Sequence, residues 1–136
     1  MAGPTYESDF AAWAFDQAAR LRAGEPVDIA NVAEELEDLG KQQRQRLESH
    51  LMVLLTHMLK WDVQTNLQSR SWDASIREHR RRTNRILRES PSLKQSLEET
   101  VCEAYRRARV KAIRETGLDD TFFTETCPYS LEEILN

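Results

Sequence analysis

Apolar side chains recur at helical spacing along the stretch from Asp28 to Trp61. At about 100° per residue, two sets of them fall on the same arc of one helix. The first set is Ile29, Val32, Ala33, Leu36 and Leu39, and the second is Leu47, Leu51, Leu54, Met58 and Trp61. A loop at the intervening Gly40 would disturb this shared phase, whereas glycine inside a helix costs only about 1 kcal/mol relative to alanine. The pattern therefore predicts one long helix, about 28–62, that carries the apolar seam of a helical bundle.

Amphipathic segments on both sides of the long helix predict the other members of the bundle. These helices are expected to begin near Glu7, after a Ser71 cap, after a Ser92 cap and at Leu131. Gly24, Ser90-Pro91 and Gly117 mark helix ends, because proline interrupts a helix and glycine readily adopts the left-handed conformation that closes one. Ser130 and Glu133 form a capping-box pattern for the last helix. The predicted fold class is all-α: a bundle of four main helices plus a short C-terminal helix, in a single domain of residues 1–136.

The fourth main helix has apolar side chains on more than one side. Its expected inner stripe is Leu93, Leu97, Val101, Ala104, Ala108 and Ala112. Cys102, Val110 and Ile113 lie off that stripe, so the second half of this helix needs cover on another side. We expect the C-terminal tail to provide it through Leu118, Phe122 and Phe123.

Length and composition are those of one globular domain. The chain has 136 residues, of which 40% are hydrophobic and 31% charged, too apolar a balance for a disordered chain. No apolar run approaches the ~18 residues of a membrane span, and the first ten residues lack the basic and apolar regions of an export signal. Cys102 and Cys127 have no Cys-x-x-Cys spacing, so we expect reduced thiols. These features predict a cytoplasmic protein with no membrane partner.

Charge is unevenly distributed along the chain, whose net charge is −4. Residues 25–39 carry six acids and no base, whereas residues 70–88 carry seven arginines against two acids. Residues 104–114 add five bases without an acid. Segments of opposite sign within one domain more often neutralise each other than bind a polyanion.

Three histidines are candidate metal ligands or catalytic groups. His50 and His57 are seven residues apart on the long helix, and His79 lies on the inner face of the next helix. A metal site would combine imidazoles with a carboxylate such as Glu35. However, seven residues separate the first two histidines by about 10.5 Å along the helix axis, too far to share one ion. We therefore expect no metal and no cofactor, and hydrogen-bonded histidines at the edge of the bundle.

Two charged surfaces are further candidates. The acidic run could bind a cation through Glu34, Glu37 and Asp38, but the helix dipole also favours acids in the first turns of a helix, and we favour that explanation. The arginine face of the third helix consists of Arg77, Arg81, Arg85 and Arg88. It could follow phosphates, although no exposed aromatic residues lie between the arginines for stacking on single strands. We favour a solvated face or one salt-bridged to acids of the long helix and the tail.

Short motifs spread along the chain also form a pattern of their own. They are Tyr6-x-x-Asp9-Phe10-x-x-Trp13, Val32-Ala-Glu-Glu-Leu-Glu-Asp-Leu-Gly40, Val53-Leu-Leu-x-His57-x-Leu-Lys-Trp61, Ser69-Arg-Ser-Trp72, Ser90-Pro-Ser-Leu93 and Glu115-Thr-Gly-Leu118 followed by Cys127-Pro-Tyr129. In this order they resemble the bacterial domain-of-unknown-function family 29, from about Tyr6 to Leu135. Thr65 and Phe123 depart from the family pattern, in which proline is expected. The resemblance implies an all-α bundle in a bacterial cytoplasm and no particular activity.

Three functional hypotheses follow. The first, which we favour, is a non-catalytic cytoplasmic helical domain that binds a protein partner or a second copy of itself, because no nucleophile, metal-ligand or phosphate-loop signature is present. The second is a metal-dependent or hydrolytic enzyme. Its candidate site residues, several of which belong to the family pattern, are His57, Trp61, Trp72, His79, Glu34, Glu35 and Asp38. The third is nucleic-acid binding through the arginine face. Convergence of the histidines on a polar pocket would favour the second hypothesis.

Overall fold

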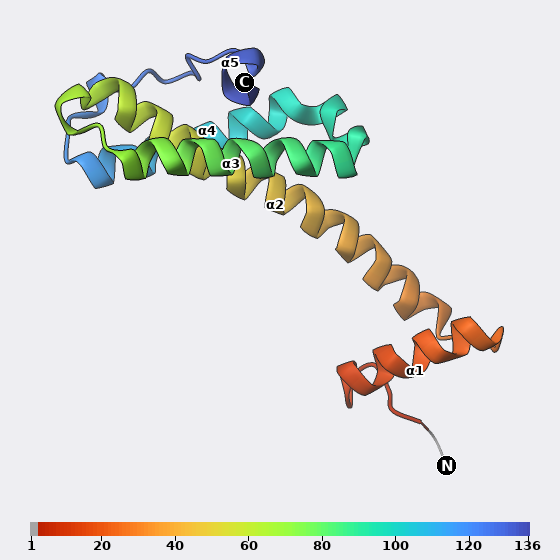
Figure 1. The fold of residues 1–136 in the computed structure, drawn as a ribbon. Helices are drawn as coiled ribbons and strands as arrows, with labels where there is room; N and C mark the ends of the chain where they lie inside the picture. The colour runs from red at the N-terminus through yellow and green to blue at the C-terminus, as the bar shows by residue number, and fades with distance from the viewer. Residues whose placement is uncertain (1–2) are drawn as a thin grey trace. The chain divides into compact units, whose positions relative to one another are not determined.

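The computed structural model of the chain describes residues 3–136 and consists of helices joined by short connections (Figure 1). The α-helices are α1 (Phe10–Ala23), α2 (Ile29–Val63), α3 (Arg70–Glu89), α4 (Leu97–Thr116) and α5 (Leu131–Leu135), and the 3-10 helices are η1 (Thr65–Leu67), η2 (Pro91–Ser96) and η3 (Asp120–Phe122). Residues 3–136 contain no strand, so the predicted all-α class is confirmed. The chain divides into two compact units, an N-terminal unit, Met1–Gln42, and a C-terminal unit, Gln43–Asn136.

The N-terminal unit is built around one buried tryptophan. Trp13 is 3% exposed, and its indole Nε1–H donates to Asp28 Oδ2 at 3.2 Å, just before α2 begins. Gln17 accepts a hydrogen bond from the backbone N–H of Asp28 at 2.6 Å. Helix α1 starts three residues later than expected, because the side chain of Asp9 caps it by accepting from Ala12 N. The expected end at Gly24 is confirmed, with φ of 71°.

Helix α2 is continuous through Gly40, as the shared phase of its apolar residues predicts. The two apolar sets on this arc nevertheless differ in burial. Leu47, Leu51 and Leu54 are fully buried in the C-terminal unit, whereas Leu36 and Ile29 are 63% and 75% exposed. The predicted seam is therefore confirmed for the second half of α2 and wrong for the first half.

The N-terminal segment does not cover the first half of the arc. Tyr6, which precedes α1, donates its hydroxyl to Glu35, and Trp13 of α1 donates to Asp28. These two acids lie roughly 80–100° around α2 from Leu36. The N-terminal segment is thus bonded to a polar flank of α2 and leaves the apolar arc open.

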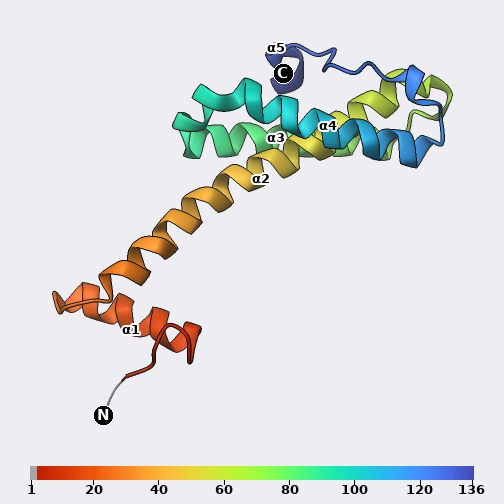
Figure 2. The same cartoon turned by 180° about the vertical axis from the view of Figure 1, so that it is seen from behind.

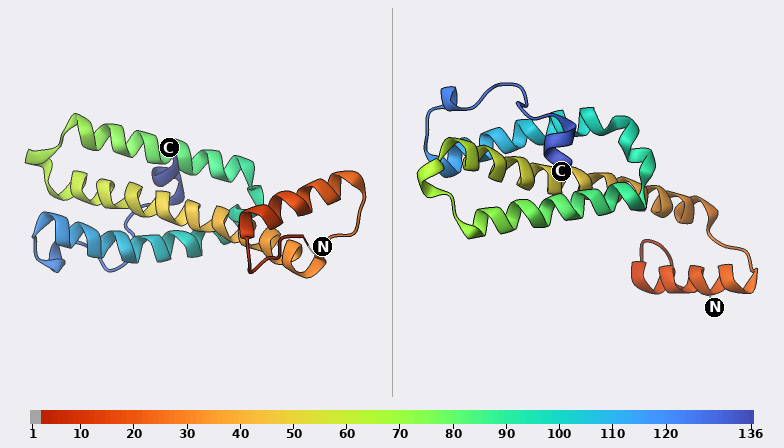
Figure 3. Two further views of the ribbon diagram at one scale, coloured as in Figure 1. Left: turned by 90° about the horizontal axis from the view of Figure 1, so that it is seen from below. Right: turned by 45° about the horizontal axis from the view of Figure 1, so that its top comes forward.

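In the C-terminal unit, the second half of α2 lies between α3 and α4, as both views of Figure 3 show; Figure 2 shows these helices overlapping, seen from behind. Side chains from all three helices form the core together with residues of the tail. Its buried members are Leu47, Leu51, Leu54, Leu55, Met58, Leu59, Ile86, Leu87, Leu97, Val101, Ala104, Tyr105, Ala108, Ala112, Phe123 and Ile134. Three helices and a tail therefore share one apolar core, and α1 belongs to the other unit.

Two predicted helix starts were wrong. Helix α3 is capped by Ser69, whose hydroxyl accepts from Trp72 N at 3.2 Å, and Ser71 lies inside the first turn. Ser92 does not cap α4, because residues 91–96 form the 3-10 helix η2 and α4 begins only at Leu97. At α3 the serine that caps is the one whose backbone is extended, Ser69, whereas Ser96 directly precedes α4 without a side-chain cap hydrogen bond.

The C-terminal tail covers the core less completely than expected. Phe123 is 3% exposed, but Phe122 is 58% exposed and Val110 of α4 stays 54% exposed. Tyr105, which the apolar pattern did not place in the core, is 2% exposed and donates its hydroxyl to the carbonyl of Thr124 at 2.6 Å. A buried tyrosine with a polar partner thus anchors the tail, and the expected cover over Val110 is absent.

Two further expectations for this region are confirmed. Ser130 and Glu133 make both hydrogen bonds of the capping box that opens α5. Helix α5 is then held by α3, since Arg80 Nε donates to the Ile134 carbonyl at 2.9 Å and Asn84 donates to the Leu135 carbonyl at 2.9 Å. The two cysteines, Cys102 and Cys127, are unpaired thiols.

Candidate functional site

Two of the three histidines meet across the α2–α3 interface. The Nδ1 atoms of His50 and His79 are 3.1 Å apart, and both rings are half-buried. His57 instead pairs its Nδ1 with the carbonyl of Val53, one turn back on α2, at 2.9 Å. A neutral imidazole has one donor and one acceptor nitrogen, so one ring of the His50–His79 pair donates and the other accepts.

The surroundings of this pair disfavour protonation of both rings. Burial lowers the pKa of His50, and the charges of Arg82 and Arg46 lower it further, while Glu78 acts in the opposite direction. The pKa of His79 is likewise lowered, first by burial and then by the charges of its neighbours His50 and His57. Near neutral pH the pair is therefore uncharged and shares one proton between the facing nitrogens.

The arginines of α3 are paired mainly with acids of the same helix. Arg77 pairs with Asp73 at 3.0 Å and Arg85 with Glu89 at 2.8 Å. Glu78 forms ion pairs with both Arg81 and Arg82, and these contacts lower the pKa of its carboxyl to about 2. The expected salt-bridging of this face within the molecule is confirmed for Arg77, Arg81 and Arg85. The expected source of the acids, the long helix and the tail, was wrong, because carboxylates three or four residues away on α3 already lie within reach.

The tryptophans of the predicted site flank the α2–α3 connection, Trp61 in the last turn of α2 and Trp72 in the first turn of α3. Trp72 packs under the ammonium of Lys60, which lies 4.9 Å from its ring centre. Trp61 instead lines a depression with Asp62, Asp73 and Tyr129, and the Tyr129 hydroxyl donates to Asp62. Burial and this hydrogen bond raise the pKa of Tyr129. These aromatic residues therefore have structural partners of their own, distinct from those of His79.

The acidic candidates Glu34, Glu35 and Asp38 belong to the N-terminal unit, whereas the histidines belong to the C-terminal unit. Glu35 accepts the hydroxyl of Tyr6, which raises the pKa of Tyr6 to about 12. Glu34 is exposed and Asp38 is half-buried. Glu35 thus serves to hold the N-terminal segment on α2.

The N-terminal unit carries most of the large hydrophobic side chains that are exposed in the described residues. Six of the nine large hydrophobic side chains exposed in the described residues belong to it: Phe10, Phe15, Leu21, Ile29, Leu36 and Leu39. Ile29, Ala33, Leu36 and Gly40 follow one another along α2 at intervals of three or four residues, and all four are exposed. We call these four residues with Leu39 the N-terminal stripe.

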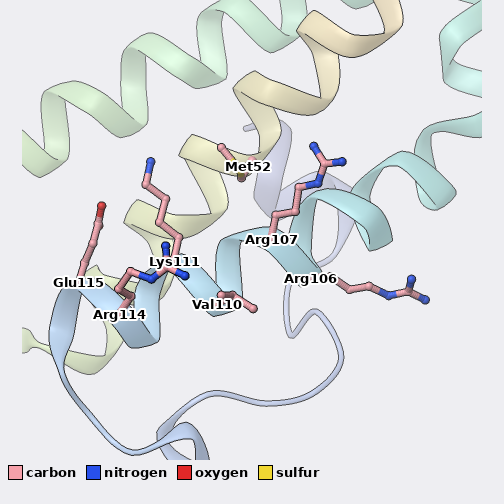
Figure 4. Close-up of a pocket in the computed structure, with 7 residues that line it drawn as sticks. All are labelled: Met52, Arg106, Arg107, Val110, Lys111, Arg114 and Glu115. Atoms are coloured by element: carbon pink, nitrogen blue, oxygen red, sulfur yellow. The ribbon is translucent and has the colours of Figure 1, made fainter.

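A groove of about 620 Å³ runs along α4 and has an apolar floor and a basic rim. Met52 of α2 and Val110 of α4 supply the apolar surface (Figure 4). Arg106 and Arg107 lie at one end of the groove, and Arg114 and Glu115 lie at the other (Figure 4). Lys111 completes the lining. We call this the α4 groove.

The rim of the α4 groove keeps an excess of positive charge. Arg107 pairs with Glu48 at 3.3 Å and Arg106 with Glu103 at 3.3 Å. Lys111 and Arg114 form no ion pair within residues 3–136. The groove therefore suits an apolar segment that carries acidic residues.

The family model described as "Domain of unknown function DUF29" matches residues 5–136, nearly the whole chain. The chain belongs to the DUF29 family. No curated protein and no solved structure matches it. Family membership confirms the resemblance noted from the motifs, and it assigns no activity to the DUF29 chain.

Two other findings bear on the class of site. Within residues 3–136 no cluster of three or more histidine, cysteine or acidic side chains is arranged to hold a metal ion. In the same range no helix of the DUF29 chain is both long enough and apolar enough to cross a membrane. Neither finding identifies a ligand.

The partner of His50 is His79 on α3, a pairing that the spacing of residues along α2 does not indicate. The α4 groove could have been found by combining the basic run 104–114 with the off-stripe position of Val110.

Proposed function

We propose that the DUF29 chain is a helical interaction module that self-associates, with the N-terminal stripe of one copy docking into the α4 groove of a second copy. The observation that carries this proposal is the exposure of the stripe. Leu36, Leu39 and Ile29 are 63%, 60% and 75% exposed on a helix whose same arc is fully buried further along. An amphipathic helix face of this kind is typically covered by another helix.

The N-terminal unit has little internal packing to offset this exposure. Among its described residues only Trp13 and Gln17 are buried. Full burial of one leucine or isoleucine side chain is worth about 1.5–3 kcal/mol. Three such side chains could supply several kcal/mol, part of which offsets the entropy lost on association.

Charge complementarity favours the α4 groove as the docking site. The segment 25–39 carries six acids and no base, and the segment 104–114 carries five bases and no acid. Packing of one stripe against an identical stripe would instead bring acids of like charge together. Electrostatic complementarity of this type selects the partner and speeds the encounter, more than it adds affinity.

The lengths of the two surfaces also match. Residues 29–39 rise about 15 Å along α2, and residues 106–114 rise about 12 Å along α4, at 1.5 Å per residue. Each surface therefore presents about two to three helical turns, the usual scale of a helix docked in a groove.

The other two hypotheses have less support. The ion pairs within α3 neutralise much of the arginine face, which argues against an extended nucleic-acid track there. Of the three histidines only His50 and His79 converge, while His57 bonds to its own helix. The acidic residues of the enzyme hypothesis belong to the other unit. A cytoplasmic setting remains part of the proposal, in keeping with two free thiols.

Sedimentation velocity over a range of protein concentrations tests the proposal. We expect the wild-type chain to shift to larger species as concentration rises, and Leu36→Gln to remain monomeric. Leu67→Gln is the matched control, since Leu67 is 60% exposed on η1, outside the stripe. A wild-type chain that stays monomeric into the range of hundreds of micromolar, or equal effects of the two substitutions, would contradict the proposal.

A further inference from the structure

A second, smaller cleft lies beside the histidine pair, away from the residues of the α4 groove. It has a volume of about 150 Å³ and is lined by Arg46, His50, Arg81, Arg82, Arg85, Ile86 and Glu89. Four of these seven residues are arginines, contributed by both α2 and α3. The small volume suits a single compact group and excludes a ligand the size of a base pair.

Charge in this cleft is not balanced. Glu78 neutralises part of Arg81 and Arg82, and Glu89 pairs with Arg85. Arg46 donates to the neutral amide oxygen of Gln43 at 3.3 Å and forms no ion pair within residues 3–136. Two carboxylates against four guanidinium groups leave two positive charges when the histidines are neutral.

The histidine pair supplies a further donor. When His79 donates from Nδ1, His50 accepts at Nδ1 and must carry its own proton on Nε2. His50 lines the cleft, and its Nε2 has no hydrogen-bond partner within residues 3–136. In this tautomer of His50 the cleft combines forked guanidinium donors with one imidazole N–H, a set that matches tetrahedral oxyanions.

We propose that this cleft binds the phosphate group of a small phosphomonoester. Such a group carries a charge of about −1.5 to −2 near neutral pH, which matches the two excess positive charges. A phosphodiester of nucleic acid carries only one negative charge per group, and it would need a longer basic track than this cleft offers. The dianionic monoester is therefore the better match, independently of whether the chain self-associates.

Binding is coupled to protonation of the histidine pair. The charged and titratable groups that face the pair are Arg46 and His57 from α2, and Glu78 and Arg82 from α3. A bound dianion offsets the repulsion from the two arginines, so the complex favours a protonated His50 more than the free protein does. Affinity for a dianion of constant charge therefore rises as pH falls from about 8 towards 6.

Nuclear magnetic resonance titrations of the full chain with methyl phosphate and dimethyl phosphate test the site. The two probes have similar shape, but only the first can be a dianion. We expect saturable binding of methyl phosphate, about tenfold or more tighter than that of dimethyl phosphate, with shifts of the His50 ring signals. Failure of methyl phosphate to saturate, or equal binding of the diester, would overturn the proposal.

Variants locate the site within the C-terminal unit. Arg46→Gln should weaken methyl phosphate binding about tenfold, the loss expected for one charge-assisted hydrogen bond. Arg77→Gln is the matched control, since Arg77 is an exposed α3 arginine that does not line the cleft, and its effect should stay within twofold. Equal losses of methyl phosphate affinity in the two variants would mean that the anion responds to the overall positive charge of the surface, and would overturn the proposed site.

Sulfate is the probe for the pH dependence, because it stays a dianion between about pH 8 and pH 6. We expect sulfate affinity to rise towards pH 6 in the wild-type chain. In His50→Gln, whose amide keeps a donor but does not titrate, the rise in affinity towards pH 6 should be much smaller, since only His79 of the pair remains to be protonated. A rise as steep as that of the wild-type chain would contradict the role assigned to His50.

Discussion

Leu36 and Leu54 are 18 residues apart on α2, five full turns at 3.6 residues each, so they occupy equivalent positions on one helix face. Leu54 is fully buried in the core, and Leu36 is 63% exposed. Alanine at a buried leucine costs about 2–5 kcal/mol, whereas an exposed substitution usually changes the free energy of unfolding by less than about 0.5 kcal/mol. The same chemical change on the same helix face should therefore have two different effects.

Urea denaturation followed by circular dichroism measures both effects. With a slope of about 2 kcal/mol per molar urea, a loss of about 3 kcal/mol in Leu54→Ala lowers the midpoint by about 1.5 M. At low protein concentration Leu36→Ala should leave the midpoint unchanged. At high concentration the wild-type chain should gain stability by association and Leu36→Ala should not.

One result would refute this reasoning. If Leu36→Ala costs about 2 kcal/mol or more in dilute solution, Leu36 is packed within the single chain, and the N-terminal stripe is not an open surface. Leu54→Ala controls for the general effect of leucine truncation on α2.

Three further predictions concern local features. The pKa values of His50 and His79 are lowered in the folded chain, chiefly by burial, so the unfolded chain binds protons more readily below about pH 6.5. The free energy of unfolding should therefore fall as pH drops through that value. An acid titration of stability should show a weaker pH dependence in His50→Gln than in the wild-type chain. Ser69→Ala should destabilise the chain by about 1 kcal/mol in thermal unfolding through loss of the α3 cap, and Ser71→Ala should have a much smaller effect. Gly117→Ala should cost about 1 kcal/mol in the same assay, because residue 117 has φ of 69°.

The helices themselves could be predicted from the sequence better than the elements that pack against them. Continuity of α2 through Gly40 followed from the shared phase of its apolar residues, since a loop rarely preserves helical phase. The ends at Gly24 and Gly117 followed from glycine chemistry, and both have positive φ. These features depend on residues near one another in sequence, where local geometry is decisive.

What covers each helix face could not be predicted in the same way. The apolar arc of α2 looks alike around Leu36 and around Leu54, because periodicity identifies a face that favours burial and not the element that buries it. The bond between Tyr6 and Glu35 attaches the N-terminal segment to another flank of α2, so this segment does not cover the first half of the arc.

The candidate site shows the same limit. Spacing along α2 correctly separated His50 from His57, but the register between α2 and α3, which pairs His50 with His79, depends on packing of residues far apart in sequence. The excess charge at Arg46 could not be predicted either, because it depends on the acids of α3 pairing with arginines of their own helix.

The central claim, docking of a stripe into a groove on a second copy, can be tested most directly by mixing two variants. Leu36→Gln impairs the stripe and keeps the groove, whereas the double variant Lys111→Glu and Arg114→Glu reverses charge in the groove and keeps the stripe. Each variant alone should sediment as a monomer, and an equimolar mixture should form a heterodimer through the intact stripe of one chain and the intact groove of the other. A mixture that remains monomeric while the wild-type chain associates would contradict the account.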